Sequence, residues 1–217
     1  MEQKELIEKT VDFVKKELKN TETGHDWWHI YRVWKLAQFI AKKEQVNSFV
    51  VELGALLHDI ADSKFYDGNE EIGPKKARDF LESLKVKKEI IDHVEKIVKN
   101  ISFKGVQHIQ EFKSPELNVI QDADRLDALG AIGIARTFNY GGFKNRLIYD
   151  PNIKPNLNMT KEEYKASTTP SINHFYEKLL LIKGRMNTNT GRQMAEKRHE
   201  FMEKFLNQFY KELEGEI

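Results

Sequence analysis

The 217-residue sequence contains no cysteine, which excludes disulfide bonds and metal sites built from thiolates. It also lacks any run of about 20 apolar residues, the length that a helix needs to cross a bilayer. The first residues, MEQKELIEKTVDFVKKELKN, mix charged and apolar positions and lack the uninterrupted apolar stretch of a signal peptide. Together these absences predict a soluble protein of the reducing cytoplasm, with no membrane partner.

An excess of charge of either sign is missing as well. Lys and Arg together number 35, Asp and Glu together number 34, and the formal net charge is +1. A chain balanced in this way has no bulk electrostatic attraction to nucleic acid or to an anionic membrane. We therefore expect no nucleic-acid partner, and any binding of phosphate must depend on a local group of Lys and Arg side chains.

Apolar residues recur at helical spacing along most of the chain, and no segment has a strand pattern of comparable strength. One irregular segment, residues 139–158, is rich in Gly, Asn, Pro and Tyr and is expected to be a functional loop rather than a linker. We predict a single all-α domain over residues 1–217, a bundle of roughly eight to ten helices. Helices are expected near residues 6–18, 30–40, 50–60, 74–84, 90–98, 115–120, 124–137, 171–186 and 191–213.

Histidine and carboxylate residues gather in three short segments, HIYRV (29–33), LLHDIAD (56–62) and DADRLDALG (122–130). The middle segment follows an apolar run that predicts a buried helix. Burying such polar groups is unfavourable unless they are paired, hydrogen-bonded or bound to a metal ion. Divalent ions that hydrolyse phosphate esters favour imidazole and carboxylate ligands. The three segments therefore call for an ion pair, a hydrogen-bond network or a metal ion, and their residue types are those of metal ligands.

The order of these segments, a histidine, then a histidine–aspartate pair, then an aspartate, resembles the HD superfamily of metal-dependent phosphohydrolases. The match in residue type, order and approximate spacing covers residues 24–137. The resemblance implies an all-α fold whose metal ligands are His29, His58, Asp59 and Asp124. The later segments GIARTFNYGG (133–142), INHFYEKLLLIKGRMNT (172–188) and AEKRHEFM (195–202) resemble a bacterial stand-alone branch of nucleoside triphosphate pyrophosphohydrolases. Helices in residues 171–213 are then expected to pack on the motif core.

The resemblance implies a divalent metal ion as the cofactor. A mixed shell of nitrogen and oxygen ligands suits Mn²⁺, Fe²⁺, Co²⁺ or Zn²⁺, and Mg²⁺ is a further candidate. Mn²⁺ is our prediction. We expect one ion rather than two, because the surroundings of His93 and His108 do not reproduce the histidine pattern of binuclear relatives.

Three further residues are predicted to take part in catalysis. Asp62 follows His58 by four residues, so a helix would place it on the side that faces the metal. The matching position in ppGpp hydrolases of the superfamily is also acidic, and we expect Asp62 to orient or deprotonate the attacking water. The alternative is a carboxylate exposed at the end of the helix. Arg32 and Lys64 are the expected phosphate contacts, and ordinary solvated charges are their alternative.

The acidic residues beside the expected ligands have separate predicted roles. Asp124 is the expected ligand of its segment because ADRL resembles the ligand-bearing segment of the superfamily. Asp122 is expected to cap a helix that begins near Asp124, and Asp127 to hydrogen-bond a ligand or to hold Arg125. Asp26 is expected to cap the helix that carries the first histidine, or alternatively to support a ligand.

These features predict a metal-dependent phosphohydrolase that acts on a small-molecule nucleotide and releases pyrophosphate from a triphosphate. A 5′-nucleotidase and a ppGpp hydrolase are the enzymatic alternatives. The ppGpp alternative is weakened by Ala128, which stands where those relatives carry an asparagine. A non-catalytic metal- or nucleotide-binding regulatory module is the third alternative, and the intact ligand set argues against it. The sequence favours no base, no oligomeric state and no pathway.

Overall fold

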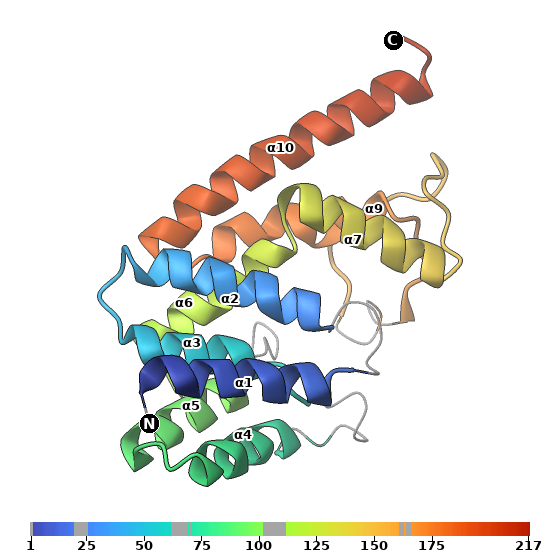
Figure 1. Ribbon diagram of the computed structural model, residues 1–217. Coiled ribbons are helices and arrows are strands. Elements are labelled where there is room, and N and C mark those ends of the chain that lie inside the picture. The colour runs from blue at the N-terminus through green and yellow to red at the C-terminus, as the bar shows by residue number, and fades with distance from the viewer. Residues whose placement is uncertain are drawn as a thin grey trace. The chain divides into compact units, whose positions relative to one another are not determined.

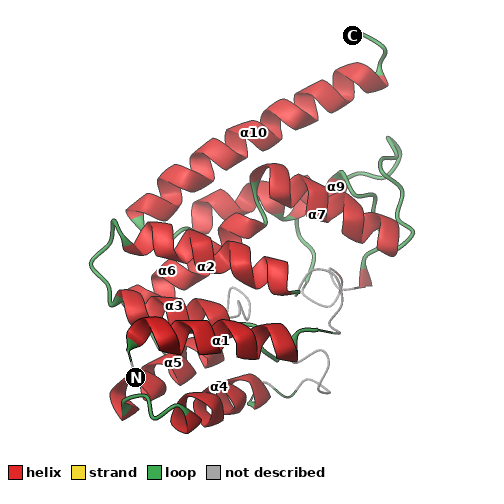
Figure 2. Ribbon diagram, in the orientation of Figure 1, coloured by secondary structure: helices red, strands yellow, loops and turns green. Residues whose placement is uncertain are grey.

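The computed structural model describes residues 2–19, 26–61, 69, 71–101, 112–160, 163 and 166–217. In these ranges the regular structure is entirely helical, as Figure 2 shows, and the predicted all-α fold is confirmed. No helix in the same ranges combines the length and the apolar character needed to cross a membrane. The bounded elements are α1 (Gln3–Glu17), α2 (Trp27–Ala41), α3 (Ser48–Leu57), α4 (Ile72–Ser83), α5 (Lys88–Asn100), α6 (Pro115–Asp127), α7 (Gly130–Phe143), α9 (Asn173–Glu177), the 3₁₀ helix η2 (Leu179–Arg185) and α10 (Asn189–Leu213).

The chain divides into two compact units, residues 1–124 and 125–217, and the division falls inside α6. In the first unit, α3 contacts α1, α2 and α5, and α4 contacts α5 (Figure 1). Apart from Ser48 and Glu52, every residue of α3 is buried, as expected for the central helix of a bundle. A Cβ atom at Gly54 would lie 2.6 Å from Ile120 Cδ1, so the side chain of Ile120 on α6 packs directly against the α3 backbone at this glycine.

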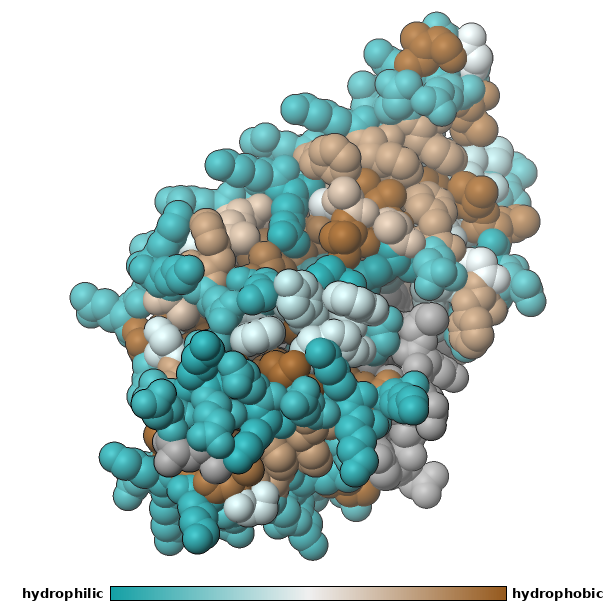
Figure 3. Space-filling model, in the orientation of Figure 1, coloured by the Kyte–Doolittle hydropathy of each residue, from teal (hydrophilic) through white to brown (hydrophobic). Residues whose placement is uncertain are grey.

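The second unit contains α7, α9, η2 and α10. Helix α10 packs on α7 and on η2. Phe205 of α10 forms an aromatic cluster with Phe138 of α7 and Phe175 of α9, with ring centroids 5.8 to 6.1 Å apart. On the face drawn in Figure 3, hydrophobic side chains gather over this unit, whereas hydrophilic ones prevail over the first. The prediction of a single domain over residues 1–217 stays a prediction.

The predicted boundary between the two helices that flank Asp124 was wrong. We expected one helix to end near residue 120 and another to begin at Asp124, but α6 runs on to Asp127. Its apolar face continues through Ala123 and Leu126, which are fully buried, and the chain turns only at Gly130, whose φ of 71° favours glycine. Asp122 therefore lies inside a helix, with 0% of its surface exposed, and does not cap one.

Two other predicted segments differ from the structure. Helix α7 extends to Phe143, so the irregular segment expected from residue 139 begins at Lys144. The single helix expected over residues 171–186 is the short helix α9 followed by η2, because the backbone leaves helical geometry at Lys178, with φ −143° and ψ −56°. Phe175, Leu179 and Ile182 remain buried, so the apolar spacing predicted burial correctly but not the type of helix.

Candidate metal centre

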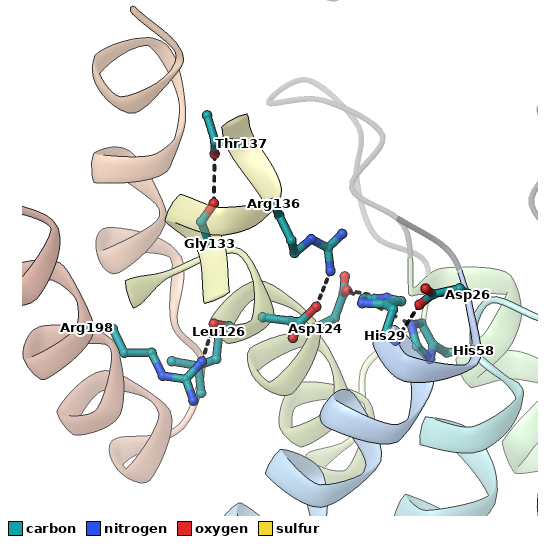
Figure 4. A network of polar contacts seen from close by, with 10 residues as sticks. Asp26, His29, His58, Asp124, Leu126, Gly133, Arg136, Thr137 and Arg198 are labelled. Atoms are coloured by element: carbon teal, nitrogen blue, oxygen red, sulfur yellow. Dashed lines mark hydrogen bonds and ion pairs between the residues drawn. The ribbon is translucent and has the colours of Figure 1, made fainter. Parts of the chain in front are cut away.

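His29 is positioned by the first turn of α2. The backbone of Asp26 is extended, and its carboxylate accepts a hydrogen bond of 2.9 Å from the backbone N–H of His29 (Figure 4). This is the geometry of a helix cap, which satisfies a donor that the helix itself leaves unpaired. The predicted capping role of Asp26 is confirmed. The imidazole of His29 is directed inward, and only 3% of the residue is exposed.

His58 lies directly after α3 and keeps helical backbone angles. Its Nδ1 is 2.8 Å from the backbone oxygen of Ala55. A carbonyl oxygen can only accept, so Nδ1 carries the proton and Nε2 of the neutral ring has a lone pair. That Nε2 atom is buried and has no hydrogen-bond partner among the residues that the structure describes. Buried polar atoms are nearly always paired, so this one requires an explanation.

The protonation of His58 favours the form that binds metals. Burial lowers the pKa of His58 below its usual value, and the charges of Asp124 and Asp59 act in the opposite direction. A histidine must be neutral to act as a ligand. Burial therefore favours an unprotonated Nε2 atom, whose lone pair is available to a metal ion.

Four predicted ligands converge in the first unit. Ligand atoms of His29, His58 and Asp59 all lie within 4.8 Å of one another. Asp124 Oδ1 is 3.5 Å from Nε2 of His29 and 4.0 Å from Nε2 of His58. Donor atoms that share one ion stand about 3 to 4 Å apart, because each lies about 2.0 to 2.2 Å from it. His29, His58 and Asp59 thus form a group that could hold a divalent ion, and Asp124 lies close to both of its histidines.

The candidate centre is reachable from solvent on its carboxylate side. The side chains of His29 and His58 are each 4% exposed, whereas that of Asp124 is 42% exposed. Two nitrogens and two carboxylates, without a thiolate, form a donor set that suits Mn²⁺, Fe²⁺, Co²⁺ or Zn²⁺. Because Asp124 is the more exposed of these side chains, a ligand from solvent would approach the centre on the side of its carboxylate.

The other predicted site residues lie in different places. Asp62, Lys64 and His108 lie outside the described residues. Arg32 is on α2, one turn after His29, and is partly buried. His93 belongs to a separate cluster at the start of α6, where its Nε2 is 3.0 Å from Ser114 Oγ and 3.6 Å from Glu116.

Two arginines make contacts near the end of α6 that the sequence analysis did not name. Within the second unit, Asp127 is 1% exposed and pairs with Arg136. Arg125, which we had expected beside Asp127, donates a 2.6 Å hydrogen bond to the carbonyl of Arg185. These pairs join residues from different elements, so no local spacing could have indicated them.

Comparison with known proteins shows similarity along nearly the whole chain. Residues 27–129 match the family model of the HD domain. The chain is 37% identical over 216 residues to the protein YpgQ of Bacillus subtilis, covering 99% of this chain and 97% of that one. A crystal structure of an HD-superfamily hydrolase from Bacillus thuringiensis is 48% identical and covers 98% of this chain and 99% of its own, with a TM-score of 0.80. The crystal structure of Bacillus subtilis YpgQ in complex with ADP is 34% identical by superposition, covers 98% of this chain and 97% of its own, and has a TM-score of 0.78.

Proposed function

The chain belongs to the HD superfamily of hydrolases, and on this premise we propose that it hydrolyses a phosphate ester or anhydride bond of a nucleotide with a divalent metal ion. The observation that carries the proposal is the Nε2 atom of His58, a buried lone pair beside His29, Asp59 and Asp124. An unpaired buried polar atom is unfavourable, and an ion that accepts the lone pair removes the penalty.

His29, His58, Asp59 and Asp124 would hold the ion, and Mn²⁺ is the proposed metal, with Mg²⁺, Fe²⁺, Co²⁺ and Zn²⁺ as other candidates. When bound, such an ion polarises a phosphoryl oxygen and makes water a stronger nucleophile. Ala55 contributes indirectly, because its carbonyl holds the tautomer and orientation of the His58 ring. Asp26 similarly fixes the first turn of the helix that carries His29.

The protein's own residues supply proton transfer and charge in this proposal. Asp62 orients the attacking water or takes its proton. Arg32 and Lys64 place positive charge against the phosphate oxygens. Because the chain as a whole is nearly neutral, this positive charge must be concentrated locally. The support for these roles is position along the chain: Arg32 lies one turn after His29, and Asp62 and Lys64 follow the His58–Asp59 pair closely.

The proposed substrate is a nucleoside triphosphate. Water attacks the α-phosphorus, the bond between that phosphorus and the bridging oxygen to the β-phosphate breaks, and the products are a nucleoside monophosphate and pyrophosphate. The ADP bound to Bacillus subtilis YpgQ supports a nucleotide as the ligand of this chain. The segments at residues 133–142 and 172–188 support the pyrophosphohydrolase branch by resemblance.

A product assay tests this function. The purified protein with Mn²⁺ is incubated with nucleoside tri-, di- and monophosphates, and the products are separated by ion-exchange chromatography. We expect monophosphate and pyrophosphate in equal amounts from the triphosphate, loss of activity in EDTA, and its return with Mn²⁺. Phosphate released only from monophosphates would instead assign a 5′-nucleotidase. No turnover of any nucleotide would indicate a binding module and contradict the proposal.

Replacing Asp62 by asparagine should leave the metal in place and remove most of the turnover. The amide cannot accept the proton of water, and such a loss typically lowers kcat by roughly 100- to 10,000-fold. Metal content by mass spectrometry and kcat are measured on the same samples. Asp79→Asn is the matched control, because Asp79 is an exposed carboxylate on α4. If Asp62→Asn loses metal in proportion to activity, Asp62 is a ligand instead.

A further inference from the structure

The three tryptophans of the chain all lie on α2, in an aromatic row of Trp27, Trp28, Tyr31 and Trp34. Tyr31 is the centre of the row. Its ring centroid is 6.0 Å from that of Trp27, 5.7 Å from that of Trp28 and 6.3 Å from that of Trp34. The four rings therefore form one contiguous cluster centred on Tyr31.

Two of the tryptophans have structural partners on other helices of the first unit. Trp34 Nε1 donates a 2.9 Å hydrogen bond to Glu52 of α3. The ring of Trp27 lies 4.9 Å from the ammonium group of Lys15 on α1. Trp28, in contrast, is 61% exposed. An indole is large and mostly apolar, so its burial normally contributes strongly to folding, and Trp28 forgoes most of that contribution.

Trp28 also stands beside the candidate metal centre. It directly precedes His29, and Arg32 follows it by four residues on the same helix. At about 100° per residue, Trp28 and Arg32 lie about 40° apart around the helix axis, and Arg32 and His29 lie about 60° apart. Side chains of a helix also tilt toward its N-terminus. The indole, the guanidinium and the metal-site imidazole therefore follow one another around the first turn of α2.

We propose that Trp28 is the platform on which the base of the nucleotide stacks while its phosphates reach the metal centre past Arg32. This inference rests on the proposed function. The edge-on contact with Tyr31, at an interplanar angle of 80°, holds the indole in place before the ligand arrives. Lys35, whose ammonium group is 5.5 Å from the Tyr31 ring, adds positive charge on the same side for an anionic ligand.

Stacking on an aromatic ring has a consequence for specificity. Every base has a flat π-face, so a platform binds different bases with similar strength, and each base gains roughly 5- to 150-fold in affinity from such a contact. The chain should therefore accept nucleoside triphosphates with different bases. Ligands that lack a base, such as inorganic pyrophosphate, should bind independently of Trp28.

The test compares Trp28→Ala, Trp28→Phe and Phe39→Ala. Phe39 is the matched control, an aromatic residue that is 46% exposed and lies three turns further along α2, where its ring contacts Lys43. We expect Trp28→Ala to raise KM for the triphosphate by roughly 5- to 150-fold with kcat changed by less than about 2-fold. Trp28→Phe should restore most of the affinity, and Phe39→Ala should match the wild-type protein.

Binding without turnover separates this proposal from the proposed function. Indole N–H signals of the three tryptophans are followed by NMR in EDTA, and Trp28→Phe identifies the signal of Trp28. Titration with ADP should shift that signal, and titration with pyrophosphate should leave it unchanged. A shift by ADP in a protein without hydrolytic activity would support the platform and contradict the proposed function.

Three results would overturn the platform. The first is an unchanged Trp28 signal with saturating ADP. The second is an equal loss of ADP and pyrophosphate binding in Trp28→Ala, because that would show a general disturbance of α2. The third is a Trp28→Ala variant with the KM of the wild type that no longer associates with a second copy of the chain or with another protein. That result would place Trp28 in a protein interface.

Discussion

Replacing His58 by alanine is expected to lower hydrolysis by roughly three orders of magnitude or more and to weaken metal binding strongly. The substitution removes the Nε2 lone pair of His58 from the candidate centre. The carbonyl of Ala55, which contacted Nδ1 of the same ring, does not replace this ligand. Asp59→Ala should have a similar effect, since its carboxylate belongs to the same group of converging donor atoms. Hydrolysis is measured with excess Mn²⁺, and metal affinity by titration with a chelating dye.

His93→Ala is the control for this prediction. His93 is a histidine of the first unit whose ring contacts Ser114 and Glu116 at the start of α6 instead of the converging donors. We expect it to keep its metal affinity and its turnover. Full activity of His58→Ala in excess Mn²⁺ would contradict the proposed metal site. Loss of metal from His93→Ala would instead favour a second ion.

Gly133→Ala is expected to destabilise the fold by about 3 kcal/mol. A Cβ atom at Gly133 would lie well inside van der Waals contact with the carbonyl group of Ala128, in the turn between α6 and α7. The obstacle is backbone rather than the end of a flexible side chain, so the connection itself must move. The free energy of unfolding is measured by urea denaturation, with the slope of the transition compared among variants.

Gly142→Ala is the matched control, on the same helix and with the same change of side chain. A Cβ atom at Gly142 meets no atom within 4 Å, so only the helix propensity of alanine acts, and the variant should be more stable by up to about 1 kcal/mol. The two variants should therefore differ in sign. A Gly133→Ala variant as stable as Gly142→Ala would contradict the prediction and show that the connection at Ala128 moves to relieve the crowding.

Local sequence determined most of the helices and the start of α2. Apolar spacing depends only on which residues follow one another, and it predicted the buried faces of α1, α3 and α10 within a few residues of their ends. Asp26 capped its helix as predicted because a cap connects residues three apart. The family resemblance rested on three short segments, and it named His29, His58, Asp59 and Asp124 as metal ligands, a role that stays a prediction.

Tertiary structure decided the properties that depend on residues far apart in the chain. Asp122 was expected at a helix end but lies buried inside α6. The helix continues past it because the apolar side chains of Ala123 and Leu126 are also buried. The contact of His58 Nδ1 with Ala55 is local, but the burial of its Nε2, which has no hydrogen-bond partner among the described residues, depends on helices from different parts of the chain. Likewise, Trp27, Trp28 and Trp34 are the same residue type on one helix, but Lys15 of α1 contacts Trp27 and Glu52 of α3 contacts Trp34, whereas Trp28 is 61% exposed.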